Sequence, residues 1–163
     1  MQQHERRVMT GLNLFPNIVS VDLDVLDKRS KDGFLLLLIS YKYDQGDAKR
    51  LAEALRQKVK TIKQTEIKVK VTRDLEKFSH DQGGPAGIFL TEHLSDEQFE
   101  KILKFAIEHH VLVFSPFAGD VERGATAGLS ISSRIQPYYN AETLMKSKIR
   151  FHHLFLKVAK SYE

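Results

Sequence analysis

The sequence predicts a single α/β domain. The expected architecture is a mostly parallel four-stranded sheet with helices on both faces, followed by a C-terminal β-hairpin and two closing helices. Apolar runs typical of buried strands alternate along the chain with amphipathic stretches typical of helices, an order that favours parallel strands joined by crossovers. The length of 163 residues suits one domain. The hydrophobic fraction of 42% and the charged fraction of 28% are those of a globular protein. We therefore expect one domain over residues 1–163, with residues 1–6 flexible.

The N-terminal part is expected to begin with a helix. Apolar residues recur at helical spacing over about residues 4–15, and Pro16 is expected to end this helix. Over residues 18–26 apolar side chains occupy alternate positions, which predicts a strand or an extended edge. Residues 34–41 form a continuous apolar run, typical of a buried parallel strand. Asp47 is then expected to cap an amphipathic helix.

Two further strand–helix units follow. The alternating residues 66–72 and the apolar run 86–90 predict two strands, with a short helix at residues 75–78 between them. Ser95 begins a capping-box signature, Ser-Asp-Glu-Gln, for the next helix. Residues 111–114 predict the fourth strand of the parallel sheet.

The C-terminal part departs from this alternation. Residues 125–131 and 135–139 are two short extended segments joined by only three residues, which predicts a hairpin added to the parallel sheet. Asn140 is expected to cap a short helix, and a last helix is expected over residues 151–162.

Residue types that the sequence lacks exclude several kinds of chemistry. The chain has no Cys, which excludes disulfides, thiol nucleophiles and iron–sulfur clusters.

The longest uncharged apolar run, residues 34–39, is far shorter than the roughly 20 residues of a membrane helix. The N-terminus does not have the pattern of a signal peptide. No nucleophile–base set or Gly-x-Ser-x-Gly motif can be assigned in the sequence. We therefore expect that the chain is not an enzyme and that it binds no cofactor.

Three other features have simpler explanations than a binding site. Neighbouring residues of a helix point about 100° apart, so the pairs His109-His110 and His152-His153 predict no metal site. The glycine-rich residues 82–87 precede a strand instead of following one, which predicts a turn and not a phosphate loop. The basic residues between 42 and 77 lack interleaved aromatic residues, so we expect a solvated surface and no nucleic-acid partner.

The loop of residues 115–124 is the candidate binding site. It follows the fourth strand, and ligands of open parallel sheets bind beyond the carboxyl ends of the strands. The residues that would contact a ligand or partner are Ser115, Phe117, Asp120, Glu122 and Arg123. Alternatively, the loop is a capped helical turn in which Asp120 and Arg123 satisfy local backbone groups. The sequence leaves both interpretations open.

Several of these segments resemble the YfiR/HmsC-like family of small periplasmic regulatory proteins. The resemblance rests on the glycine-rich turn at residues 119–124, on residues 127–129, on Asn140 and on the closing helix at residues 155–160. With the order of the preceding strands it covers about residues 7–162. It implies the fold described above and a non-catalytic regulator that binds the periplasmic part of a membrane-bound diguanylate cyclase and controls cyclic-di-GMP output.

The chain departs from this family in two ways. It has Phe15-Pro16 where many relatives have a Trp-Pro pair, and it lacks the cysteine pairs of some relatives. The missing cysteines exclude redox control in this chain.

Two functions from different classes follow. The first is a cell-envelope regulator that binds a membrane signalling protein; its expected location is periplasmic, with the cytoplasm as the alternative. The second is a single-lobe small-ligand-binding protein associated with transport or signalling, whose partner is a small molecule. A homodimer is compatible with both functions.

Overall fold

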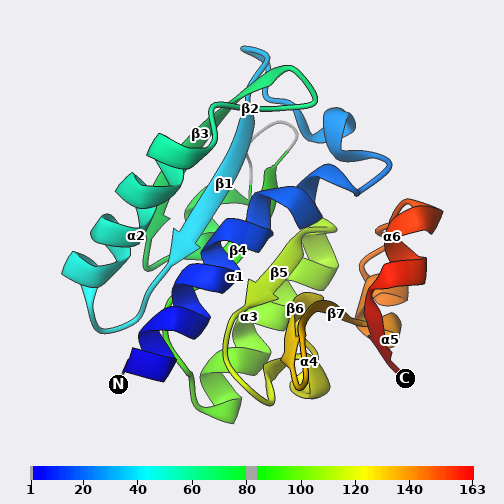
Figure 1. Cartoon of the computed structure of the whole chain (residues 1–163). Helices are drawn as coiled ribbons and strands as arrows, with labels where there is room; N and C mark the ends of the chain where they lie inside the picture. Colours follow the sequence, from blue (N-terminus) through cyan, green and yellow to red (C-terminus); the bar gives the residue numbers. More distant parts are fainter. Residues whose placement is uncertain (1, 80–83) are drawn as a thin grey trace.

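The computed structural model describes residues 2–79 and 84–163, apart from the side chains of Gln2 and Gln3. In this part of the chain the strands form one eight-stranded sheet in the order β2-β3-β1-β4-β5-β6-β7-β8. Helices pack on both faces of the sheet (Figure 1). The α/β class is thus confirmed. The predicted sheet, with four mostly parallel strands and a hairpin, has fewer strands than the observed one.

Five neighbouring strands of the sheet are parallel. They are β3 (Thr65–Thr72), β1 (Leu35–Ser40), β4 (Pro85–Leu90), β5 (Leu112–Ser115) and β6 (Ala127–Ile131). Every residue of β1, β4 and β5 is buried, as expected for strands covered on both faces.

Three short strands complete the sheet at its two ends. Strand β2 (Thr61–Ile62) pairs antiparallel with β3 at one edge. Strand β7 (Ile135–Asn140) pairs antiparallel with β6, which confirms the predicted hairpin. Strand β8 (Lys160–Tyr162) pairs parallel with β7 and forms the other edge. Neither β2 nor β8 has an apolar pattern that predicts a strand.

The two faces of the sheet have separate apolar clusters. Helices α1 (Gln2–Ser20) and α2 (Gln45–Lys58) cover one face, where they pack on Leu35, Leu37 and Ile39 of β1. Helix α3 (Asp96–His109) covers the other face and packs on Leu36 and Leu38. Ser95 and Gln98 form the predicted capping box at the start of α3. Figure 1 shows α1 and α2 in front of the sheet and α3 behind it.

Helix α1 is longer than predicted. It continues through Pro16 to Ser20, and residues 18–26 are therefore not a strand. They form the end of α1, a turn and the start of a 3₁₀ helix, η1 (Val25–Lys28). Proline removes one backbone hydrogen bond from a helix interior. That loss is offset here because Phe15 and Ile18, on either side of the proline, are fully buried against the sheet.

Short helices connect the remaining strands. The predicted helix at residues 75–78 is the 3₁₀ helix η2 (Leu75–Phe78), and α4 (Asp120–Arg123) lies between β5 and β6. Asn140 caps α5 (Ala141–Lys146), as expected. The last helix, α6 (His153–Val158), is shorter than predicted because the chain continues into β8. The turn predicted at residues 82–87 lies in part outside the described residues, and its end belongs to β4.

Candidate functional site

The order of the strands places a topological switch point between β1 and β4. From β1 the chain crosses through α2 to β3 on one side, and it then returns past β1 to β4 on the other side. The connections that follow β1 and β4 therefore diverge, and ligands of open α/β sheets bind in the crevice outside the carboxyl ends of such a strand pair. In this chain the crevice begins at Tyr41 and Thr91.

A cavity of about 450 Å³ lies at this position. It extends between η2 and α3 over the ends of β1 and β4. Its apolar lining is formed by Leu75, Leu90, Leu94, Ile102 and Phe105. Its volume lies within the range of small-molecule sites, roughly 300–1,000 Å³.

Glu92 joins the two loops that border the cavity. Its carboxylate accepts backbone N–H bonds from Tyr43 (2.9 Å) and Asp44 (2.8 Å), and a third from Lys42. These amides immediately precede α2, whose N-terminus favours negative charge. The side-chain amide of Gln98 donates to the Tyr43 hydroxyl at 3.0 Å and links the loop after β1 to the first turn of α3.

The polar lining of the cavity contains charges of both signs. Four cations contribute to it, and they come from the ends of β1 and β3 and from α3: Lys42, Arg73, Lys101 and Lys104. The carboxylates that line it are Asp74, Glu76, Glu92 and Glu108. Two of these four are already engaged in local structure, because Asp74 caps η2 by accepting from the Glu76 amide at 3.1 Å and Glu92 binds the loop amides.

The loop predicted as the binding site is largely a buried hydrogen-bonded turn. Ser115 and Asp120 are 1% and 0% exposed, and the Ser115 hydroxyl donates to Asp120 at 2.6 Å. The Ser115 oxygen also accepts from the Phe117 amide at 3.1 Å. Arg123 donates to Asp120 through Nε (3.1 Å) and Nη2 (2.8 Å) and to Asp96 through Nη1 (2.7 Å). This arrangement favours the capped-turn interpretation of Ser115, Asp120 and Arg123.

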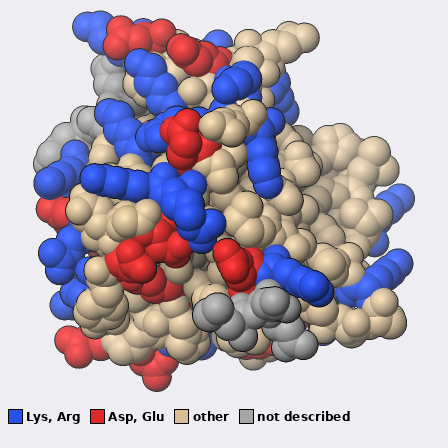
Figure 2. Space-filling view, turned by 60° about the vertical axis from the view of Figure 1, so that its left-hand side comes forward, with Lys and Arg blue, Asp and Glu red and all other residues tan. Residues whose placement is uncertain are grey.

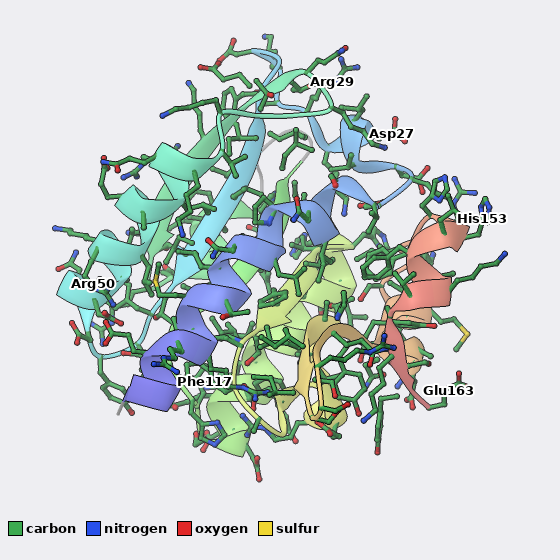
Figure 3. The ribbon with its side chains drawn as sticks, in the orientation of Figure 1. Asp27, Arg29, Arg50, Phe117, His153 and Glu163 are labelled. Carbon is green, nitrogen blue, oxygen red and sulfur yellow. The ribbon has the colours of Figure 1, made fainter. Side chains whose placement is uncertain are left out.

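The other two predicted residues, Phe117 and Glu122, border a smaller hollow of about 180 Å³, together with Arg7 and Lys160. The Tyr138 hydroxyl donates to Glu122 at 3.2 Å, and burial, together with the negative charge of Glu122, raises the pKa of Tyr138 to about 12. Phe117 is buried near the N-terminal end of α1 (Figure 3). The structure thus separates the five predicted residues between a buried network and a second, smaller hollow.

His109, His110, His152 and His153 line neither of these two cavities. The His110 ring nitrogen lies 3.1 Å from the Ser147 carbonyl oxygen, and the rings of His152 and His153 stack at 4.7 Å. Within residues 2–79 and 84–163, no group of three His, Asp or Glu side chains is arranged to hold a metal ion. None of the helices described in the structure is both long and apolar enough to cross a membrane.

The basic region of residues 42–77 forms a surface of mixed charge. In Figure 2, which brings the α2 side of the molecule forward, Lys and Arg side chains lie beside acidic ones. Arg50 pairs with Asp47, and Arg56 pairs with Glu53. Part of the positive charge on this surface is therefore neutralised locally.

Comparisons with known proteins show the fold of this chain. No family model matches it, and no curated protein matches it. The solved structures that resemble it include an ABC domain from Streptococcus pneumoniae in complex with L-Trp, with a TM-score of 0.54, 9% identity and 88% of this chain covered. A ligand-free, open substrate-binding protein with adhesive properties from Clostridium difficile matches with a TM-score of 0.57, 15% identity and 94% covered. A conserved domain protein from Vibrio cholerae matches with a TM-score of 0.57, 13% identity and 86% covered.

The matched chains are longer than this one. The matches cover 61%, 58% and 57% of the Streptococcus, Clostridium and Vibrio chains. At these low identities the comparisons establish one thing: this chain shares the α/β fold of proteins that include substrate-binding domains.

Proposed function

We propose that this chain is a small-ligand-binding domain whose ligand occupies the switch-point cavity between η2 and α3. The observation that carries the proposal is the cavity of about 450 Å³ at the carboxyl ends of β1 and β4, with an apolar lining and a charged rim. The smaller hollow beside Phe117 has about 180 Å³ and is therefore the weaker candidate.

Two of the similar solved structures support a ligand-binding role. One is described in complex with L-Trp and another as a substrate-binding protein. Both are longer chains, so their ligands indicate only which compounds to screen. L-Trp is one such probe, and other amino acids, nucleotides and cell-wall fragments complete the panel.

Thermal unfolding with this panel tests the proposal. A ligand at a hundredfold excess over its Kd stabilises the native state by about 2.7 kcal/mol, which gives a clear rise in Tm. The variant Ile102→Trp places a large ring in the cavity, and we expect it to abolish the rise. The control Ile135→Trp adds the same ring at an exposed position of β7 outside the cavity, and we expect the rise to persist.

Two results would contradict the proposal. One is a rise in Tm that Ile102→Trp leaves intact and Glu122→Gln removes, because that would assign the ligand to the hollow beside Phe117. The other is the absence of any rise across the panel.

The regulatory function remains a prediction that rests on the family resemblance alone. Binding to a membrane-bound diguanylate cyclase, and a periplasmic location, would be tested by affinity capture of membrane proteins that have a periplasmic domain. Recovery of no such protein would count against this function without affecting the proposed cavity.

A further inference from the structure

We infer that the switch-point cavity takes a small organic anion with an apolar or aromatic body. This inference rests on the proposed function and names the chemical class of its ligand. It follows from three properties of the cavity: its apolar floor, its cations, and the hydrogen bonds that two of its carboxylates form with nearby backbone amides.

The floor of the cavity suits an apolar body. Leu90, Leu94 and Phe105 are 1%, 7% and 4% exposed, so they present a fixed surface that belongs to the core under α3. A ligand ring placed on this surface would be removed from water, and removal of apolar area from water is the main non-directional contribution to binding.

The cations of the cavity form no ion pair with the acidic residues that the structure describes. Among the described residues, no carboxylate oxygen lies within salt-bridge distance of Lys42, Arg73, Lys101 or Lys104. Some cations outside the cavity, among them Arg50, Arg123 and Arg150, do pair with carboxylates at 2.7–2.8 Å. The positive charge at the cavity is therefore available to a ligand.

The negative charges of the cavity are partly compensated. Glu92 accepts from three backbone amides at the start of α2, and its charge faces the positive end of the helix dipole. Asp74 is oriented as the cap of η2. Glu76 and Glu108 are exposed on the rim. Within residues 2–79 and 84–163, four cations without an ion pair thus face two carboxylates with no such compensation, which favours an anionic ligand over a cationic one.

Glu92 also determines where the anionic group binds. The backbone amides that precede α2 would otherwise offer donors to a ligand, but the Glu92 carboxylate already occupies them. We therefore expect the acid group of the ligand to bind the side-chain cations, among them Arg73, which follows β3, and Lys101 of α3.

Three probes of similar shape and different charge test the inference. They are phenylacetate (an anion), phenylacetamide (neutral) and phenethylamine (a cation at neutral pH), titrated into the full chain by calorimetry. We expect phenylacetate to bind about tenfold more tightly than the amide, because hydrogen bonds to a charged group are the stronger ones. The preference should shrink as salt is added, since the cations are exposed.

Variants locate the effect in the cavity. The double variant Arg73→Gln with Lys101→Gln is expected to weaken phenylacetate about tenfold and to leave phenylacetamide unchanged. The control Lys157→Gln removes one positive charge from α6, outside the cavity, and is expected to change neither affinity. Amide chemical shifts of residues 90–94 and 101–105 should move with phenylacetate.

The outcomes separate this inference from the proposed function. If the neutral or cationic probe binds the cavity as tightly as the anion, the ligand class is wrong and the proposed function stands. If the double variant leaves phenylacetate binding unchanged, the cations do not select the ligand and the inference is overturned. If none of the probes or panel compounds binds, both fail.

Discussion

At the scale of single residues, the loop between β5 and β6 depends on Asp120. Its side chain is fully buried, and it accepts hydrogen bonds from Ser115 and twice from Arg123. Burial on its own would lower the pKa of Arg123, but the hydrogen bonds to Asp96 and Asp120 raise it above its ordinary value. Arg123 also lies 4.1 Å from the centre of the Phe99 ring. Asp120 therefore fixes the position of α4 against α3.

Replacement of Asp120 tests whether this loop is structural. We expect Asp120→Ala to lower the free energy of unfolding by about 2–3 kcal/mol, because it leaves the buried Ser115 hydroxyl and the Arg123 guanidinium without their partner. Urea denaturation measures the loss. The control Asp96→Ala removes the exposed partner of Arg123 and should cost less than about 1 kcal/mol. A cost of Asp120→Ala within about 0.5 kcal/mol would favour the functional interpretation of the loop.

The raised pKa of Tyr138 makes the free energy of unfolding depend on pH in the alkaline range. Burial and Glu122 raise its pKa in the folded state from 10.0 to about 12. The folded protein therefore retains a proton that the unfolded chain loses, so stability is full below pH 10 and falls as the pH rises towards 12. The variant Tyr138→Phe should show a smaller fall in Tm over this range, while both proteins share the titration of the remaining groups. Equal slopes for the two proteins would contradict the assignment.

At the scale of elements, close backbone contact explains one glycine of the sheet. A Cβ atom at Gly128 in β6 would lie 2.5 Å from the Ser115 carbonyl oxygen and 2.8 Å from Val121. We expect Gly128→Ala to lower the free energy of unfolding by about 1–3 kcal/mol through overpacking. The matched control is Gly46→Ala in the first turn of α2, where the nearest atom is 3.6 Å away. It should raise stability by about 0.4–1 kcal/mol, because alanine restricts the unfolded chain. Calorimetric unfolding of both variants measures the difference.

The elements that could be predicted from sequence are those with a strong local pattern. Strand β1 is a continuous apolar run and α3 begins with a capping box, and both lie where they were expected. Pro16 is a local signal for a helix end and predicts a shorter α1, whereas tertiary burial of Phe15 and Ile18 extends the helix through the proline. Strand β8 has no apolar alternation, and it forms because β7 offers it a free edge.

At the scale of the whole molecule, the site depends on strand order, which no local pattern encodes. Ligands of open sheets bind at the carboxyl ends of strands, which predicts a site in the loop after β5, but the crevice forms where the strand order reverses, between β1 and β4. Arg73 follows β3, whereas Leu90 and Lys101 belong to β4 and α3, and Arg73 joins the other two only because β3 and β4 lie on opposite sides of β1. The fold class could therefore be predicted from local sequence patterns. The position of the cavity could not, because it depends on the strand order β3-β1-β4.

Glu92 provides a test of this arrangement across the switch point. Its carboxylate connects the loop after β4 to the three amides that follow β1. We expect Glu92→Ala to lower the free energy of unfolding by about 1–2 kcal/mol through the lost hydrogen bonds. It should also raise the affinity for phenylacetate roughly tenfold, because the three amides that Glu92 occupies become available to the carboxylate of the ligand. The control Glu97→Ala removes an exposed carboxylate in the first turn of α3, outside the cavity lining, and should leave the affinity unchanged. Weaker binding of phenylacetate to Glu92→Ala than to the native chain would show that Glu92 holds the loops in the binding geometry and does not compete with the ligand.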